Sequence, residues 1–253
     1  MGKVIGIINQ KGGVGKTTTA VNLASCLALS GHKTLLIDSD SQGNTTTGLG
    51  FEKEKLQNTL YEVLINGEEP SSAVVKTKIK KLHLLPAKTS LAGAEIELVG
   101  MTDREYIMKK AVSSIRDNYE YIIIDCPPSL GLMTLNSLVA SDSILVPIQA
   151  EFYALEGVVQ LMKTIKSVQK KMNPSIYLEG VLLTMFDGRT NLSLQVAEEV
   201  KKYFGEKVFR TMIPRSVKIS ESPSFGEPVV TYDPKSKGAE AYKKLCREVV
   251  RRA

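Results

Sequence analysis

The stretch that most constrains this chain lies near its start, where an apolar run meets a glycine-rich turn and then a helix-forming segment. Residues 3–9 read KVIGIIN, and residues 16–30 have a helical composition. Between them, Gly12, Gly13 and Gly15 let consecutive backbone N–H groups point inward toward an anion, aided by the positive end of the following helix. A strand, a turn of this spacing and a helix together predict a phosphate-binding loop rather than a turn that binds nothing.

The polar side chains of this loop indicate a nucleotide and a magnesium ion. The Lys16 ammonium would reach the β and γ phosphates as a point charge, and the Thr17 hydroxyl would ligate Mg²⁺. The usual pattern G-x-x-x-x-G-K-[ST] is broken at Gln10, which stands where the first glycine is expected, and Lys11 is an addition to it. One set of phosphates does not require two lysines, so Lys11 needs a separate explanation.

Two further strand-like runs end in carboxylates. YIIIDCPPS places Asp125 at the carboxyl end of an apolar run, where a carboxylate that holds magnesium is expected. LLIDSDSQGN ends with Asp38 and Asp40, which lie two residues apart and therefore on one side of the pleat. One of this pair could assist the metal while the other orients an attacking water. The alternative is a solvated strand end, which the nearby phosphate loop makes the weaker interpretation.

Short β-branched runs alternate with longer amphipathic ones along the chain, which is typical of parallel strands joined by crossover helices. We predict an α/β fold with a mostly parallel, twisted sheet and helices on both faces, in a single domain of residues 1–253. The predicted strands are 3–9, 33–40, 82–87, 119–127, 143–149 and 177–186, and the predicted helices are 16–30, 103–117, 154–172, 191–204 and 237–252. The polar stretches 41–58 and 66–81 are expected to be surface excursions of the same domain.

The composition narrows the class of protein. Lys and Arg number 33 against 27 Asp and Glu, and the net charge of +6 favours an anionic partner or merely aids solubility. Three widely spaced cysteines, Cys26, Cys126 and Cys246, lie in apolar surroundings, so we expect small buried side chains in a reducing compartment. No apolar stretch approaches the roughly 18 residues that a membrane span needs. We therefore expect a soluble, cytoplasmic protein.

The last predicted helix, 237–252, has an apolar stripe with basic residues elsewhere on its surface. Such a helix could lie on a membrane, but the stripe is modest and no flexible linker precedes it, so we expect it to dock on the core. The stripe consists of Ala239, Tyr242, Leu245, Cys246, Val249 and Val250.

The loop KGGVGKTT resembles the deviant Walker A motif of the ParA/MinD family of ATPases, and most of all the short chromosomal ParA proteins of the Soj type. The resemblance covers essentially the whole chain and implies a P-loop NTPase of the deviant Walker A class. It continues through DSDSQGNTTTGLG, LAGAEIEL, YIIIDCPPSLG, YALEG, GVLLTMFDGRTNL, IPRSVKISESPSFGEPV and YDPKSKGAEAY.

The resemblance accounts for the second lysine. It implies an ATP-bound homodimer in which Lys11 crosses the interface to the partner's nucleotide while Lys16 serves its own subunit. It also implies that Asp40 positions the hydrolytic water, that Asp38 assists near the metal, and that Asp125 is the Walker B acid. The stretch 42–48 matches a switch loop that senses the γ phosphate. ATP and Mg²⁺ are the implied cofactors, and ATP is favoured over GTP because no Asn-Lys-x-Asp guanine signature occurs.

The same resemblance implies contacts for each part of the nucleotide. The phosphates would lie against the loop, and the adenine would lie against a separate set of residues from the second half of the chain. The implied nucleotide-binding residues are Lys11, Gly12, Gly13, Val14, Gly15, Lys16, Thr17, Thr18, Met185, Asp187 and Pro214.

Family members of this type bind double-stranded DNA without sequence preference, through basic residues that form one surface only in the dimer. Arg189 and Lys218 stand at matching positions, and Arg215 is a nearby candidate. The alternative is that each is a solvated loop charge. Two residues depart from the family pattern: Ser41 replaces a proline in the switch loop, which leaves that loop less rigid, and Lys218 stands where close relatives often carry Arg, so the bidentate fork is lost.

We therefore expect an ATP-dependent switch for chromosome or plasmid partitioning, associated with the nucleoid when ATP is bound, whose hydrolysis a ParB-type centromere-binding protein stimulates. One alternative is a MinD-like membrane ATPase of division-site placement. Another is a metabolic enzyme of the same loop family, such as an amide ligase or an iron–sulfur reductase. The cysteine spacing disfavours the reductase, whereas a ligase, which would need a substrate pocket, stays open as an alternative. No terminal tyrosine cluster supports a kinase relative.

Overall fold

The computed structural model describes residues 1–151 and 154–252, and a single seven-stranded sheet runs through it. The strand order is β3-β4-β2-β5-β1-β6-β7, with every pairing parallel except that of β3 with β4. The predicted α/β class and the mostly parallel sheet are confirmed. The strands are β1 Lys3–Ile7, β2 Thr34–Asp38, β3 Val75–Lys76, β4 Leu82–Leu85, β5 Tyr121–Asp125, β6 Ser143–Gln149 and β7 Tyr177–Thr184.

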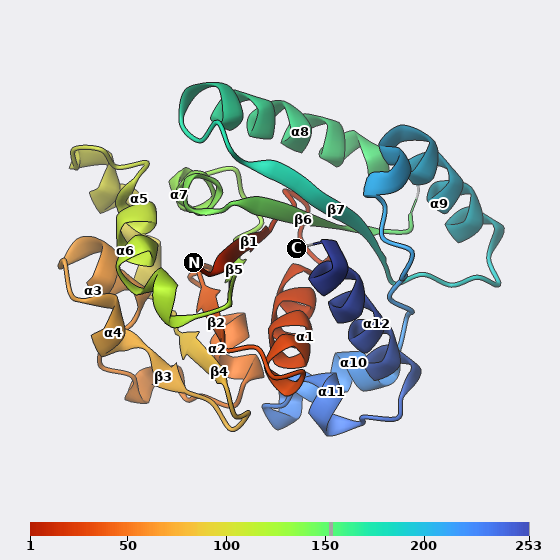
Figure 1. Cartoon of the computed structure of the whole chain (residues 1–253), viewed down its shortest axis with the longest axis horizontal. Helices are drawn as coiled ribbons and strands as arrows, with labels where there is room; N and C mark the ends of the chain where they lie inside the picture. Colours follow the sequence, from red (N-terminus) through yellow and green to blue (C-terminus); the bar gives the residue numbers. More distant parts are fainter. Residues whose placement is uncertain (152–153, 253) are drawn as a thin grey trace.

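Helices cover both faces of the sheet (Figure 1). Alternate residues of each strand point to opposite faces, and the buried side chains accordingly form two clusters, one with α1, α11 and α12 and the other with α3 to α9. The helices are α1 Lys16–Leu29, α2 Asn44–Gly48, α3 Leu60–Ile65, α4 Pro70–Ala73, α5 Leu91–Glu97, α6 Ile107–Ile115, α7 Leu132–Ala140, α8 Ala154–Lys171, α9 Asn191–Phe204, α10 Val217–Glu221, α11 Val229–Tyr232 and α12 Lys237–Arg252. The matched stretch YALEG begins at Tyr153, which lies outside the described residues.

Helix α12 packs on the core through the predicted stripe. Its residues Ala239, Tyr242, Leu245, Cys246 and Val249 are buried with side chains of α1. The expectation of docking is therefore confirmed, and the apolar side of this helix is not open to a lipid surface. Within the described residues, no helix is both long and apolar enough to span a bilayer.

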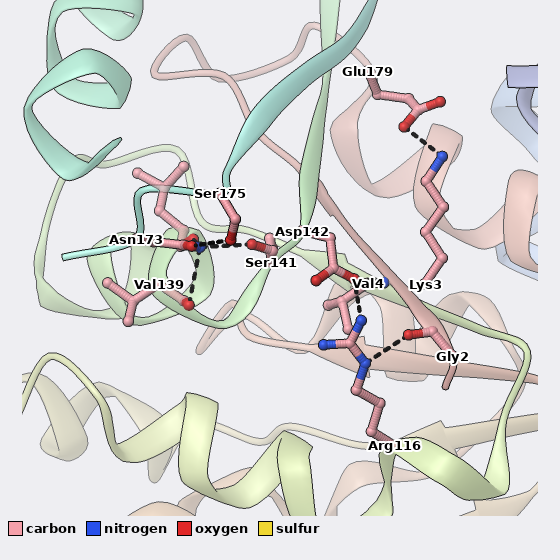
Figure 2. A network of polar contacts seen from close by, with 11 residues as sticks. Gly2, Lys3, Val4, Arg116, Val139, Ser141, Asp142, Asn173, Ser175 and Glu179 are labelled. Atoms are coloured by element: carbon pink, nitrogen blue, oxygen red, sulfur yellow. Dashed lines mark hydrogen bonds and ion pairs between the residues drawn. The ribbon is translucent and has the colours of Figure 1, made fainter. Parts of the chain in front are cut away.

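The amino-terminal edge of the sheet is held by polar contacts that join distant segments (Figure 2). Arg116 donates to the Gly2 carbonyl at 2.6 Å and pairs with Asp142, whose carboxylate accepts the Val4 N–H at 2.8 Å. The Asn173 amide donates to three carbonyls at the end of α7. These contacts fix the amino-terminal end of β1, so the loop that follows its carboxyl end starts from a rigid strand.

Several predicted bounds were wrong for local reasons. The helix expected over 103–117 begins only at Ile107, because the preceding residues form turns in which Asp103 has a φ of 53°. The strand expected over 177–186 ends at Thr184, because Met185 has a φ of 51°. The stretch 41–58 is not wholly a surface excursion, since Thr45 and Thr46 in α2 are completely buried.

Candidate functional site

The glycine-rich loop joins β1 to α1 and is held from the far side by β7. Gly13 and Gly15 have φ angles of 75° and 86°, a region that favours glycine, and α1 begins directly after Gly15. The Thr184 hydroxyl donates to the Val14 carbonyl at 2.8 Å. A Cβ on Gly15 would lie 3.7 Å from the Thr184 side chain. The end of β7 therefore sets the curvature of the loop.

The two loop lysines point in different directions. Lys16 is buried, with its ammonium 2.9 Å from the Lys11 carbonyl, and burial lowers the pKa of its amine against the opposing pull of Asp125. The Lys11 side chain is 44% exposed and forms an ion pair with Glu151 of the same chain. Lys16 thus faces the inside of the loop, and Lys11 faces outward.

Asp125 lies beside Asp38 at the carboxyl ends of β5 and β2, where the two residues are paired in register. Both are fully buried. Burial raises the pKa of Asp125 to about 6, although the Thr45 hydroxyl donates to its carboxylate and lowers the pKa. The Thr45 bond to Oδ2 is 2.7 Å long, whereas Oδ1 is buried and has no hydrogen-bond partner among the described residues.

Asp38 is held by the short helix α2. Its Oδ2 accepts the Thr46 backbone N–H at 2.9 Å and the Thr46 hydroxyl at 2.7 Å. Burial and the neighbouring Asp125 raise the pKa of Asp38 to about 8. Asp40 is nearly buried, and its Oδ1 accepts the Gln42 N–H at 2.9 Å. Asp40 therefore lies near both Asp38 and Asp125 beside the loop.

These side chains fit a magnesium ion. Thr17, Asp38 and Asp125 supply hard oxygen donors, which Mg²⁺ prefers, and Mg²⁺ typically takes only one or two protein carboxylates besides phosphates and water. The orphaned Oδ1 of Asp125 is an atom that the metal or a metal-bound water would satisfy. A cation would also relieve the desolvated charges that raise both pKa values. Within residues 1–151 and 154–252, no group of three or more His, Cys, Asp or Glu side chains lies close enough together to hold a metal ion without other ligands.

A cavity of about 250 Å³ lies next to the loop and collects most of the residues predicted to contact adenine. Gly15 and Thr18 line it on the loop side, and Met185, Pro214 and Arg215 line it on the other. The left-handed Met185 turns the chain after β7 toward this cavity. Asp187 is not among the lining residues. Its carboxylate is held by Arg189, which lowers the pKa of Asp187 to about 2.

The basic residues predicted to bind DNA are on the surface, but two of them are paired. The Arg189 side chain is 89% exposed and grips Asp187 with bonds of 2.9 and 2.7 Å. The Lys218 ammonium lies 2.6 Å from Glu221 and 5.5 Å from the centre of the Tyr232 ring. Exposed ion pairs are weakly held, so phosphates can compete for both cations. Arg215 lines the cavity beside the loop.

Four residues of this region were not singled out from the sequence. Thr45 and Thr46 lay within the matched stretch 42–48, but nothing in their spacing indicated that their hydroxyls hold Asp125 and Asp38. Thr184 and Glu151 are 170 and 140 residues from their loop partners. No local pattern reports a contact at that separation, so these two were beyond sequence reasoning.

Comparison with known proteins shows which family has this sequence and fold. The sequence model of the family described as "AAA domain" matches residues 2–178. The sporulation initiation inhibitor protein Soj of Bacillus subtilis (strain 168) is 55% identical over 249 residues, covering 98% of each chain. The chromosome partitioning protein ParA of Myxococcus xanthus is 50% identical over 252 residues, covering all of this chain and 89% of ParA.

Among solved structures, cobyrinic acid a,c-diamide synthase from Mycobacterium smegmatis with bound ADP and magnesium superposes with a TM-score of 0.88. It is 39% identical and covers 99% of this chain and 95% of its own. The partitioning proteins share more of the sequence than this neighbour does, over the same near-complete length. With a deviant loop, three carboxylates beside it and this identity along its whole length, the chain belongs to the Soj/ParA family of deviant Walker A ATPases.

Proposed function

We propose that this protein is an ATPase that acts as a nucleotide-controlled switch in the partitioning of a chromosome or plasmid. The observation that carries the proposal is that its two loop lysines differ in position: Lys16 is buried in the loop and Lys11 is exposed. A lysine that faces outward from a phosphate loop is useful if a second nucleotide approaches from another subunit. The 55% identity to Soj over nearly the whole chain gives this geometry its biological setting.

ATP and Mg²⁺ are the cofactors. The triphosphate would lie in the loop of residues 11–18, with Lys16 and the helix N-terminus facing its charge. Thr17, Asp38 and Asp125 would hold the magnesium ion, directly or through its waters. When bound, the ion neutralises charge on the β and γ phosphates during the displacement. The base would enter the cavity lined by Met185 and Pro214.

Hydrolysis needs a positioned water and little else from the protein. Asp40 is the side chain proposed to orient that water, because it lies just beyond the end of β2 and its backbone N–H donates to Asp38 Oδ1, which keeps it beside the metal site. Its Oδ1 accepts from Gln42, which restricts its rotation. In its own chain Lys11 pairs with the partly exposed carboxylate of Glu151, so it can exchange that partner for the phosphates of a second subunit.

A homodimer follows from this use of Lys11. Two chains facing each other across two nucleotides would each contribute one lysine to the other's phosphates. Loss of the γ phosphate would remove part of the charge that Lys11 meets, so ATP and ADP would differ in how strongly they favour the dimer. Arg189 and Lys218 would then form a surface for the backbone of double-stranded DNA, with two copies of each cation in the dimer. A ParB-type protein would stimulate hydrolysis and release the DNA, and the ATP-bound form would associate with the nucleoid.

The test is binding to a random-sequence duplex with ATP and with ADP across a salt series. The Arg189→Glu, Lys218→Glu double variant should lose binding, and the slope of log affinity against log salt should fall by about 0.9 for each DNA phosphate that the variant no longer neutralises. The charge-matched control is Lys55→Glu, Lys110→Glu, because both lysines are exposed and paired with a carboxylate as Arg189 and Lys218 are. Binding that is equally strong with ADP, or equally reduced in the control, would refute the switch.

An amide ligase is the second candidate, because the solved synthase is 39% identical to this chain. A ligase that takes nitrogen from glutamine often uses a reactive cysteine. The three cysteines here are buried, and burial raises the pKa of Cys126 to about 12, so their thiols stay protonated. Phosphate release that depends on a carboxylic acid and ammonia, and not on DNA, would favour the ligase.

A further inference from the structure

Two glycines from distant parts of the chain touch through their backbones below the nucleotide site. Gly50 follows α2, and Gly226 follows the 3₁₀ turn Ser222–Phe225; both have left-handed φ angles, 81° and 65°. A Cβ on Gly226 would lie 2.5 Å from the Gly50 Cα, and a Cβ on Gly50 would lie 3.0 Å from the Gly226 oxygen. Neither position can accept a side chain without moving backbone, so the contact is closer than ordinary packing.

The Gly50 end of this contact leads directly into the nucleotide site. Gly50 N–H donates to the Thr47 carbonyl in the last turn of α2. On the buried side of the same short helix, Thr45 and Thr46 hold Asp125 and Asp38 with bonds of 2.7 Å each. A five-residue helix fixed at both buried carboxylates has little freedom to move without its end moving too.

The Gly226 end leads to the proposed DNA surface. Phe225, the residue before it, stacks on Tyr232 with 4.9 Å between ring centres. The Tyr232 hydroxyl donates to Glu221 at 3.0 Å, and Glu221 is the carboxylate that pairs with Lys218. Every step in this series is a direct contact. In Figure 1, α2, α10 and α11 lie together around one end of α1, which agrees with the contacts that join these elements.

We propose that the Gly50–Gly226 contact couples the nucleotide site to the Lys218 surface, with α2 as the moving element. The inference rests on the proposed function and adds to dimerisation a path within one chain by which ATP acts on the DNA surface. A magnesium ion beside Asp38 and Asp125 would change the hydrogen bonds that these carboxylates accept from Thr46 and Thr45. Helix α2, which carries both threonines, would shift as a result. The backbone contact passes this shift to Phe225 and Tyr232, which alters the hold of Glu221 on Lys218.

A tryptophan reporter tests this path without DNA. The chain contains no Trp, so Phe225→Trp places a single indole beside Tyr232. ATP with Mg²⁺ should change its emission in that variant, and Gly226→Ala added to it should abolish most of the change. Binding of a fluorescent ATP analogue, measured separately, should stay within about threefold in both, because α2 still holds the carboxylates. If Gly226→Ala does not fold, the milder Gly50→Ala replaces it.

The matched control is Gly67→Ala. Gly67 also has a left-handed φ, 72°, but no described atom lies within 4 Å of an added Cβ, so it carries the backbone strain without the contact. In a parallel DNA assay, ATP should strengthen binding by about tenfold in the Gly67→Ala protein and by less than about threefold in Gly226→Ala. Emission changes that survive Gly226→Ala, or that disappear equally in Gly67→Ala, overturn the inference. A normal emission response with no DNA binding in the wild type would instead count against the proposed function.

Discussion

Replacing Thr46 by Val tests whether α2 is held by the buried carboxylate of Asp38. The substitution keeps the β-branched shape and removes one hydroxyl. That hydroxyl donates to Asp38 at 2.7 Å and accepts the Ala87 N–H at 3.0 Å. Both partners are buried and would be left short of a hydrogen bond. At pH 9, where Asp38 is charged, its bond contributes about 1.5–3 kcal/mol and the neutral bond to Ala87 about 0.5–1.5 kcal/mol, so the loss should be about 2–4.5 kcal/mol.

Neighbouring threonines supply graded comparisons on the same helix. Thr45→Val removes a single bond to Asp125 and should cost about 1.5–3 kcal/mol. Thr47 is exposed, with its hydroxyl 3.2 Å from the Gly43 carbonyl, so Thr47→Val should cost less than about 0.5 kcal/mol. In thermal denaturation at pH 9 without nucleotide, each kcal/mol corresponds to about 2–4 °C in a chain of this size, so Thr46→Val should lower the midpoint by roughly 4–18 °C.

The stability loss in Thr46→Val should depend on pH, which the loss from a simple packing defect would not. The pKa of Asp38 is raised to about 8, so its contribution to stability is present below its unfolded pKa and is lost as pH rises through about 8. The Thr46 hydroxyl lowers this pKa, and removing it raises the pKa further. The stability difference between wild type and Thr46→Val should therefore widen from pH 6 to pH 9. A difference that stays constant, or a Thr47→Val protein that behaves like Thr46→Val, would refute the reasoning.

Three further outcomes follow from the loop. Thr184→Val frees the Val14 carbonyl and should raise the KM for ATP several-fold with little change in kcat; an unchanged KM would mean that β7 does not shape the loop. Glu151→Gln removes the counter-ion of Lys11 and should strengthen ATP-dependent dimers in sedimentation. Lys11→Ala should abolish these dimers. Dimers that persist in Lys11→Ala with normal hydrolysis would contradict the role of Lys11 at the interface. Asp40→Ala should keep ATP binding and stop turnover, trapping the protein on DNA; rapid phosphate release would exclude Asp40 from positioning water.

The sheet and its loop could be predicted because their signals are local. The apolar run 3–9, the glycines that follow and the helical segment after them lie within about thirty residues, and their order is itself the structural motif. The strands β5 and β2 could be found from apolar runs that end in Asp125 and Asp38 for the same reason. Other elements have weaker local signals: β3 is only two residues long, and α7 has no exposed polar face because its polar residues are buried, so neither was predicted.

The sequence by itself determined which residues would carry the chemistry: glycines for the turn, two lysines, a threonine and three carboxylates at strand ends. Tertiary structure decided how these are held. The strand order places β5 between β1 and β2, which brings Asp125 beside Asp38 although 87 residues separate them. Thr184, Glu151 and Gly226 reach their partners only because folding brings together segments that lie 140 residues or more apart in the sequence. Residue type and spacing along a strand or turn are local properties, whereas a contact between distant segments exists only after the chain has packed.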